Sequence, residues 1–313
     1  MATKHLEGKV AIVTGGAGGM GSHVSRVFAE QGAKVVVADT GADVEGRMGV
    51  DPTRVDAVVE DIRKAGGQAV AFIGDIADME TAERLVGFAL ENYGTLDILV
   101  CAHGILRERM IFNMSEDDWD GVIRAQLRGC FTVTKFASIL WRTQRNGGRV
   151  IYFTSDAGIS GGPGQSNYSA AQAGKIGLMR SNARALERYG VTSNVIAPLA
   201  ATRMTDRGRG VEAGADGPPS ATAAGKPMDP KNVAPLLVWL ASEEGGAANG
   251  KIFGVSGHRI SLYEDPVQER YLHTRDAYFD IDKLFELWPM TLGLQAYPLP
   301  EIEGFPRQRE ATA

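Results

Sequence analysis

Seven short apolar runs alternate with longer helical segments along most of the chain. The runs are continuous in Val, Ile, Ala and Leu, as strands buried on both faces of a parallel sheet require. They lie at residues 9–15, 33–39, 68–75, 96–104, 149–155, 190–198 and 251–257. Helical patterns lie between them, at 19–31, 51–66, 79–92, 116–143, 167–189 and 230–243. The repeat predicts a doubly wound α/β Rossmann fold, with a seven-stranded parallel sheet and helices on both faces.

The composition argues against several other classes of protein. The 313 residues carry a net charge of −5, so no basic excess points to nucleic acid as a partner. The sequence contains no run of about 18 apolar residues and no signal-peptide pattern, so neither membrane nor secretion is expected. Cys101 and Cys130 are expected to be buried free thiols in a reducing, cytoplasmic compartment. The five histidines show no ligand spacing, so no metal site is predicted.

Two segments depart from the repeat. Residues 203–229 are rich in Gly, Pro, Ala and Ser, and a substrate lid is favoured there over a plain surface loop. Residues 261–313 contain Trp288 and several tyrosines, and are too aromatic to be simply disordered. We expect this C-terminal extension to pack on its own or a neighbouring subunit, beyond a domain formed by residues 1–260.

A glycine-rich turn follows the first expected strand. Residues 14–21, TGGAGGMG, place Gly15, Gly19 and Gly21 in the pattern TGxxxGxG between a strand and a helix. Such glycines allow a tight turn and close approach of the backbone to a pyrophosphate at the helix N-terminus. The turn therefore predicts a dinucleotide-binding site, and Ala17 and Met20 are included in it.

The ends of the next two strands indicate which dinucleotide binds. Asp39 ends the second strand, where a carboxylate accepts hydrogen bonds from the ribose hydroxyls of NAD and repels a 2′-phosphate. No arginine follows it at positions 40–42, so NAD is preferred over NADP. Asp75 and Ile76 end the third strand, where the adenine would lie, although Asp75 could instead cap the next helix.

TGxxxGxG, Asp39, the GDI of residues 74–76 and a distal serine–tyrosine pair together resemble the short-chain dehydrogenase/reductase family, over residues 6 to about 260. The stretches AHGILRERMIFNMSEDDWDGVI and SNVIAPLAATRMT carry a narrower likeness. They are similar to the dehydrogenase units related to peroxisomal multifunctional enzyme type 2 and 17β-hydroxysteroid dehydrogenase type 4. That group acts on 3-hydroxyacyl thioesters and steroid alcohols, so the resemblance implies interconversion of a secondary alcohol and a ketone.

The resemblance also implies roles for individual residues. Tyr168 would donate or accept the proton of the substrate oxygen, and Ser155 would hydrogen-bond that oxygen. The implied cofactor-binding set further includes Ala102, Gly104, Tyr168, Gln172, Pro198 and Thr202. Members of the family usually form dimers or tetramers through helices that correspond to 116–143 and 167–189, so a homodimer or homotetramer is implied.

Two positions of the family's catalytic set have changed in this chain. The lysine expected four residues after Tyr168 is Gln172, and the asparagine of the preceding helix is Gln126. A neutral amide can still hydrogen-bond the nicotinamide ribose. It cannot lower the tyrosine pKa from about 10 to about 7, which takes about 4 kcal/mol. Because oxidation needs tyrosinate and reduction needs neutral tyrosine, we expect oxidation to be weak at neutral pH and to recover in alkali.

Two neighbouring groups are candidates to replace the missing lysine. Lys175 could approach the same helix face, although a surface charge is the favoured role. His103, in the turn after the fourth strand, could extend a proton relay, although filling space is favoured.

Three functions remain open at this point. The leading hypothesis is an NAD-dependent oxidoreductase of a bulky secondary alcohol or ketone, with an atypical Ser-Tyr-Gln site. A second is a protein of the same fold that binds NAD but performs elimination, hydration or C–C cleavage. A third is a silent subunit, against which the retention of Ser155 and Tyr168 argues.

Overall fold

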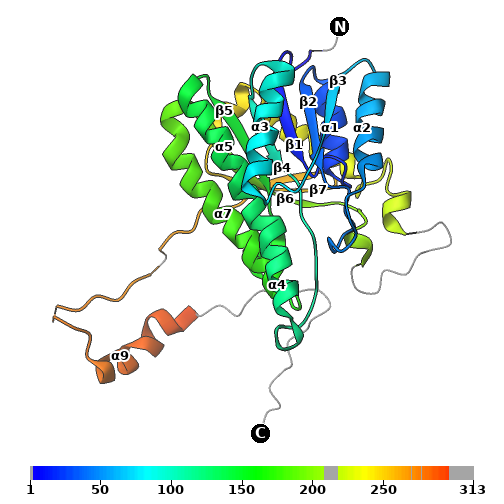
Figure 1. The fold of residues 1–313 in the computed structure, drawn as a ribbon. Coiled ribbons are helices and arrows are strands. Elements are labelled where there is room, and N and C mark those ends of the chain that lie inside the picture. The colour runs from blue at the N-terminus through cyan, green and yellow to red at the C-terminus, as the bar shows by residue number, and fades with distance from the viewer. Residues whose placement is uncertain (1–2, 208–217, 269, 276, 296–313) are drawn as a thin grey trace. The chain divides into compact units, whose positions relative to one another are not determined.

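The computed structural model describes residues 3–207, 218–268, 270–275 and 277–295, and the chain divides into two compact units, Met1–Tyr263 and Glu264–Ala313. The described part of the first unit contains one eight-stranded sheet in the order β3-β2-β1-β4-β5-β6-β7-β8 (Figure 1). Its strands are β1 (Val10–Thr14), β2 (Lys34–Asp39), β3 (Gln68–Ile73), β4 (Ile98–Cys101), β5 (Gly148–Phe153), β6 (Val191–Leu199), β7 (Ile252–Ser256) and β8 (Arg259–Leu262). The seven expected parallel strands are confirmed. The eighth, β8, pairs antiparallel with β7 at the sheet edge and was not predicted.

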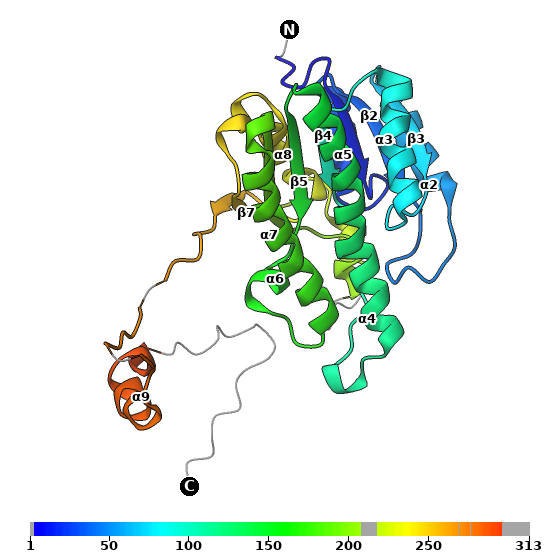
Figure 2. The same cartoon turned by 60° about the vertical axis from the view of Figure 1, so that its left-hand side comes forward.

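Helices cover both faces of this sheet, as a doubly wound fold requires. Helices α1 (Gly21–Glu30), α2 (Pro52–Lys64) and α8 (Ala234–Ala241) pack on one face, whereas α3 (Met79–Tyr93), α5 (Gly129–Gln144) and α7 (Ser166–Leu186) pack on the other (Figure 2). Alternate side chains of β1 show why both faces are apolar. Ala11 and Val13 belong to the first core cluster, and Val10 and Ile12 belong to the second.

The helix expected at 116–143 is divided in the structure. Helix α4 (Glu116–Ile123) is followed by a π-helical turn at Arg124–Arg128, which leads directly into α5. A π-helical turn adds a residue to the helical repeat and is frequent at functional sites. Here it carries Gln126, one of the predicted catalytic positions, and turns it into the interior.

The start of α3 resolves one alternative left open by the sequence. The side chain of Asp78 accepts the Thr81 N–H and caps this helix. Asp75 instead accepts the Ala77 N–H at 2.9 Å and forms an ion pair with Arg124 at 2.6 Å. Asp75 is therefore not the cap of α3.

Two predicted segments lie partly outside the described residues. Residues 208–217 of the expected lid are not described, while its flanks form 3-10 turns at Thr205–Arg207 and Pro219–Thr222. In the C-terminal unit, α9 spans Ile281–Leu287, and residues 296–313 are not described. The lid and the packing of the extension therefore stay predictions. Among the described helices, none has the length and apolarity needed to cross a membrane.

Candidate active site

Two adjoining pockets open at the carboxyl ends of the strands, where the strand order reverses between β1 and β4. The glycine-loop pocket is lined by these predicted residues: Gly15, Ala17, Gly19, Met20, Gly21, Asp39, Asp75, Ile76, Ala102, Gly104 and Thr202. The tyrosine pocket is lined by the others: Gln126, Ser155, Tyr168, Gln172 and Pro198. Both pockets also contain Met20, Ala102, His103, Gly104, Thr202 and Met204. The structure thus gathers every predicted residue around one pair of pockets, and their roles stay predictions.

The glycines of the first loop are required by close contacts. Gly15 has φ +68°, and a Cβ there would lie 2.6 Å from the Cα of His103. A Cβ at Gly19 would lie 2.8 Å from Cγ2 of Thr202. Side chains at these positions would therefore collide with the turn after β4 or with the loop after β6.

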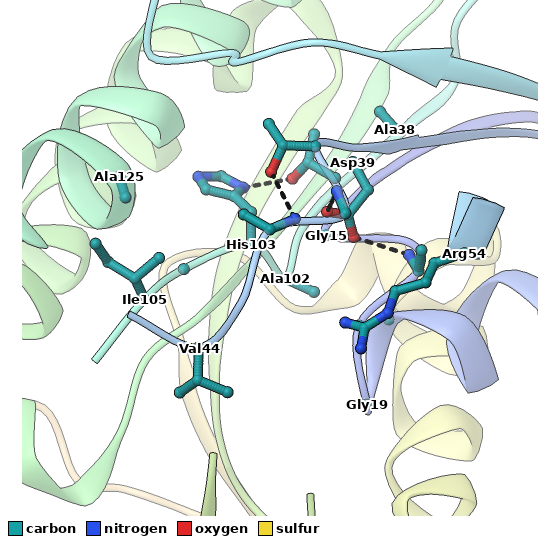
Figure 3. Close-up of a pocket in the computed structure, with 18 of the residues that line it drawn as sticks. Gly15, Gly19, Ala38, Asp39, Val44, Arg54, Ala102, His103, Ile105 and Ala125 are labelled. Atoms are coloured by element: carbon teal, nitrogen blue, oxygen red, sulfur yellow. Dashed lines mark hydrogen bonds between the residues drawn. The ribbon is translucent and has the colours of Figure 1, made fainter. Parts of the chain in front are cut away.

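Asp39 is held firmly at one end of the glycine-loop pocket (Figure 3). Its Oδ2 accepts the Ala17 N–H at 3.0 Å and its Oδ1 accepts the Gly41 N–H at 2.9 Å. Arg54, from α2, lines the same pocket. Arg54 was not predicted, because it lies fifteen residues beyond Asp39 in the sequence. A guanidinium group in this part of the pocket can bind the 2′-phosphate of NADP, so Arg54 acts against the preference for NAD that Asp39 predicts.

Tyr168 and Ser155 line the second pocket from two neighbouring helices. Tyr168 lies in the first turn of α7, and Ser155 caps α6 (Asp156–Ser160) by accepting the Ala157 N–H at 3.2 Å. Burial raises the pKa of the Tyr168 phenol, while hydrogen bonds with Gln172 and Ser155 oppose part of the rise. The phenol is therefore neutral at neutral pH.

Glu108 is an acidic member of the tyrosine pocket that the sequence analysis did not single out. It lines this pocket, and its Oε1 accepts a hydrogen bond from Gln165 Nε2 at 2.6 Å. Its negative charge adds to the rise in the pKa of Tyr168. The only sequence signal was its place in the loop after β4, at the same edge of the sheet as the two pockets.

Lys175 is fully buried, so the expectation that it is a surface charge is wrong. Its Nζ donates to Oε1 of Gln126 at 2.6 Å and to the carbonyl oxygen of Phe153 at 3.0 Å. These two acceptors receive two of the three N–H groups of the ammonium, which offsets part of the cost of burying it. Burial lowers the pKa of Lys175. The sequence did not reveal this partnership because Gln126 and Phe153 come from other elements.

Gln126 joins Lys175 to Gln172. Its Oε1 also lies 3.4 Å from Nε2 of Gln172, and its Nε2 donates to the carbonyl oxygen of Ile105 at 3.0 Å. Among the described residues, the buried Oε1 of Gln172 has no hydrogen-bond partner. An unpaired buried acceptor costs about 1–3 kcal/mol, so it favours a ligand that supplies a donor at this point.

The free cysteines are buried, as predicted. Cys130 Sγ lies 3.7 Å from Nε2 of His103, and the Nδ1 of the same ring lies 2.6 Å from Oγ1 of Thr14. His103 therefore does more than fill space, because both ring nitrogens have polar neighbours.

The residues present fit a nicotinamide dinucleotide. The glycine-loop pocket is bounded by the loop backbone and the fixed carboxylate of Asp39. In the adjoining pocket, Oε1 of Gln172 offers an acceptor without a partner among the described residues. A ribose hydroxyl is a donor of the kind that this oxygen lacks.

Comparison with known proteins assigns the family. Residues 9–210 match the model of the short chain dehydrogenase family. The chain belongs to this family and is an oxidoreductase with the Rossmann fold. Members of the family generally use NAD or NADP and act on small-molecule substrates. The resemblance seen in the sequence is thereby confirmed.

Individual relatives agree with the narrower resemblance. Hydroxyacyl-CoA dehydrogenase ChsB1 of Mycobacterium tuberculosis is 41% identical over 277 residues, which cover 86% of this chain and 83% of that protein. Peroxisomal multifunctional enzyme type 2 of Mus musculus is 39% identical over 250 residues, which cover 80% of this chain and 32% of the mouse protein. A crystal structure of a short chain dehydrogenase from Mycobacterium avium has a TM-score of 0.81 and 37% identity, covering 96% of this chain and 100% of that one.

Proposed function

We propose that the protein is an NAD-dependent dehydrogenase that interconverts a secondary alcohol and a ketone on a hydroxyacyl thioester or another bulky substrate. One observation carries the proposal: Tyr168 and Ser155 line a pocket that shares a wall with the glycine-loop pocket. A substrate oxygen beside Tyr168 would then lie next to a bound nicotinamide. The name of the tuberculosis relative, hydroxyacyl-CoA dehydrogenase, supports a hydroxyacyl thioester as the substrate class.

In this proposal the protein residues bind the substrate, orient it and move one proton. When bound, the nicotinamide cofactor supplies or accepts the hydride. The Ser155 oxygen already accepts a backbone N–H, so its hydroxyl hydrogen can be directed at the substrate oxygen. Tyr168 donates its proton to that oxygen during ketone reduction and removes it during alcohol oxidation.

The raised pKa of Tyr168 makes the two directions unequal. A neutral phenol is ready to donate a proton at neutral pH, whereas tyrosinate forms only in alkali. We therefore propose that ketone reduction is the faster direction near neutral pH. In this proposal Gln172 and Gln126 lie on the ribose side of the cofactor. Gln172 Nε2 and Lys175 Nζ both donate to Oε1 of Gln126, which fixes the two amides in place.

NAD is the proposed cofactor because Asp39 is already fixed by two backbone N–H groups. A rigid carboxylate receives ribose hydroxyls well and opposes a 2′-phosphate. Arg54, which lines the same pocket, is the feature that could weaken this preference.

A homo-oligomer in the cytoplasm is proposed for the assembled enzyme. Phe131 and Ile139 of α5 are each 47% exposed and lie on a helix through which family members usually associate. The two buried free thiols suit a reducing compartment.

The test is a turnover assay with NAD(H) and NADP(H) over a panel of acyl-CoA thioesters, ketones and steroid alcohols, from about pH 6 to 10. The proposal expects NADH-dependent reduction of a ketoacyl-CoA at neutral pH and oxidation that rises into alkali. Tight NADH binding without hydride exchange on any substrate would contradict it. That result would favour non-redox chemistry, or a silent subunit if an active partner co-purifies.

A further inference from the structure

A cluster of three metal-ligand side chains lies behind the wall that both pockets share. The Sγ atoms of Cys101 and Cys130 and a ring nitrogen of His103 all lie within 4.8 Å of one another. Cys101 ends β4, His103 follows it in the next turn, and Cys130 comes from the first turn of α5. Cys101 and His103 are two residues apart in the chain, and the fold brings Cys130 to them.

Hydrogen bonding fixes which nitrogen of His103 faces the thiols. The hydroxyl of Thr14 has one hydrogen, and it donates that hydrogen to the carbonyl oxygen of Val100 at 3.1 Å. In the tautomer that leaves this bond in place, the hydroxyl accepts from Nδ1 of His103, 2.6 Å away, and Nδ1 carries the ring hydrogen. Nε2 is left with a lone pair directed at Cys130 Sγ, 3.7 Å away. Metal-binding histidines are oriented in the same way, by a hydrogen bond at the other nitrogen.

The separation of Cys130 and His103 suits two ligands of a tetrahedral ion, and the other pairs of ligand atoms lie within 4.8 Å of each other. Zinc–sulfur bonds of about 2.3 Å and zinc–nitrogen bonds of about 2.05 Å place neighbouring sulfur and nitrogen ligands about 3.6 Å apart. The separation of Cys130 Sγ and His103 Nε2 is 3.7 Å. Gly129 makes room for this arrangement, because a Cβ there would lie 2.8 Å from Nε2 of His103.

The three side chains differ in their exposure. The two cysteines are completely buried, whereas His103 lines both pockets and connects the cluster to them.

We propose that Cys101, His103 and Cys130 form a binding site for one soft divalent metal ion of the zinc type. Binding replaces the proton of each thiol by a metal–sulfur bond and uses the lone pair on Nε2, so the two thiol protons are released to solvent. Three protein ligands are one short of the four that zinc prefers, and a water molecule from the pockets would complete the set.

The test uses the full, tag-free chain with Co²⁺ as a spectroscopic probe and Zn²⁺ as its competitor. The wild type is expected to bind one Co²⁺ per chain with a thiolate-to-cobalt absorption band, which Zn²⁺ removes. Cys101→Ser and Cys130→Ser should each weaken the band and lower Co²⁺ affinity by about tenfold or more. His103→Asn is the third variant, because an asparagine amide can still donate to Thr14 and preserve the fold. His258→Ala, which removes an exposed histidine, is the matched control.

Thermal unfolding of each variant without metal checks that it is folded. A ligand variant that does not fold is replaced by its alanine counterpart. The proposal is wrong if the folded wild type gives no thiolate band. It is also wrong if both serine variants keep the wild-type band, or if His258→Ala loses the band as His103→Asn does. Because the readout is absorbance, failure of the proposed dehydrogenase activity would not affect it.

Discussion

Replacement of Gln172 by lysine tests how the site works without the lysine that is usual in the family. An ammonium group about 4 Å from the phenolic oxygen of Tyr168 favours tyrosinate by about 4 kcal/mol at an effective dielectric constant near 20. At about 1.36 kcal/mol per unit, this lowers the pKa of Tyr168 by about 3 units. Gln172→Lys should therefore shift the alkaline rise of alcohol oxidation toward neutral pH by about that amount.

The same substitution should destabilise the fold through Lys175. Nε2 of Gln172 lies 3.4 Å and Nζ of Lys175 lies 2.6 Å from the same Gln126 Oε1, so these nitrogens are at most 6.0 Å apart. Two ammonium groups at about 6 Å repel by about 2.8 kcal/mol at the same dielectric constant. The low pKa of the buried Lys175 limits the repulsion, because loss of its proton relieves it. We expect a coupling of about 2.8 kcal/mol where both groups are charged, and a smaller one where Lys175 has lost its proton.

The assay is a double-mutant cycle of Gln172→Lys and Lys175→Met. Denaturant unfolding at neutral pH gives the coupling energy, and kcat/KM for oxidation against pH gives the apparent pKa. The reasoning is refuted if the two substitutions have additive effects on stability, within about 0.5 kcal/mol. It is equally refuted if the Gln172→Lys profile superimposes on that of the wild type.

Three further predictions concern the cofactor loop and the buried lysine. Asp39→Asn should weaken NADH binding by about tenfold or more and improve NADPH binding, as measured by fluorescence titration, because it removes charge-assisted hydrogen bonds worth about 1.5–3 kcal/mol. Burial lowers the pKa of Lys175 in the folded state below its unfolded value of 10.5. The free energy of unfolding of the wild type should therefore rise with pH between the folded and unfolded pKa values, and denaturant unfolding of Lys175→Met should show no such rise. Gly15→Ala should weaken dinucleotide binding and lower the melting temperature, whereas Gly87→Ala, in an open position of α3, should raise the melting temperature.

Most of the fold could be predicted from the sequence, because continuous apolar runs of strand length specify strands that are buried on both faces. The antiparallel β8 was missed, since its pattern of exposed and half-buried residues resembles that of a loop. The π-helical turn was also missed, because residues 124–128 continue a helical periodicity and nothing local marks the extra residue.

The site was predicted where the chemistry follows a local motif. The glycine loop, Asp39 and Ser155 belong to short patterns at strand ends, Tyr168 follows from the family resemblance, and all of them line the two pockets. Lys175 was misjudged because its partners come from other elements, and a lone lysine on a helix is usually exposed.

The thiol–imidazole cluster was missed for a related reason. Cys130 is distant in sequence from the turn after β4 that it contacts, and only the packing of α5 on the sheet brings them together. Sequence spacing therefore revealed the parts of the site that lie on one segment, and tertiary packing decided the rest.

The most direct test of the proposed function is NADH oxidation with acetoacetyl-CoA at neutral pH, for the wild type and Tyr168→Phe, together with NADH binding by both. We predict that the wild type reduces the ketone. Tyr168→Phe should bind NADH equally well, but its turnover rate should be lower by about 100-fold or more. Equal rates for the two proteins, or tight NADH binding by a wild type that transfers no hydride, would contradict the assignment of Tyr168 as the proton donor of a dehydrogenase.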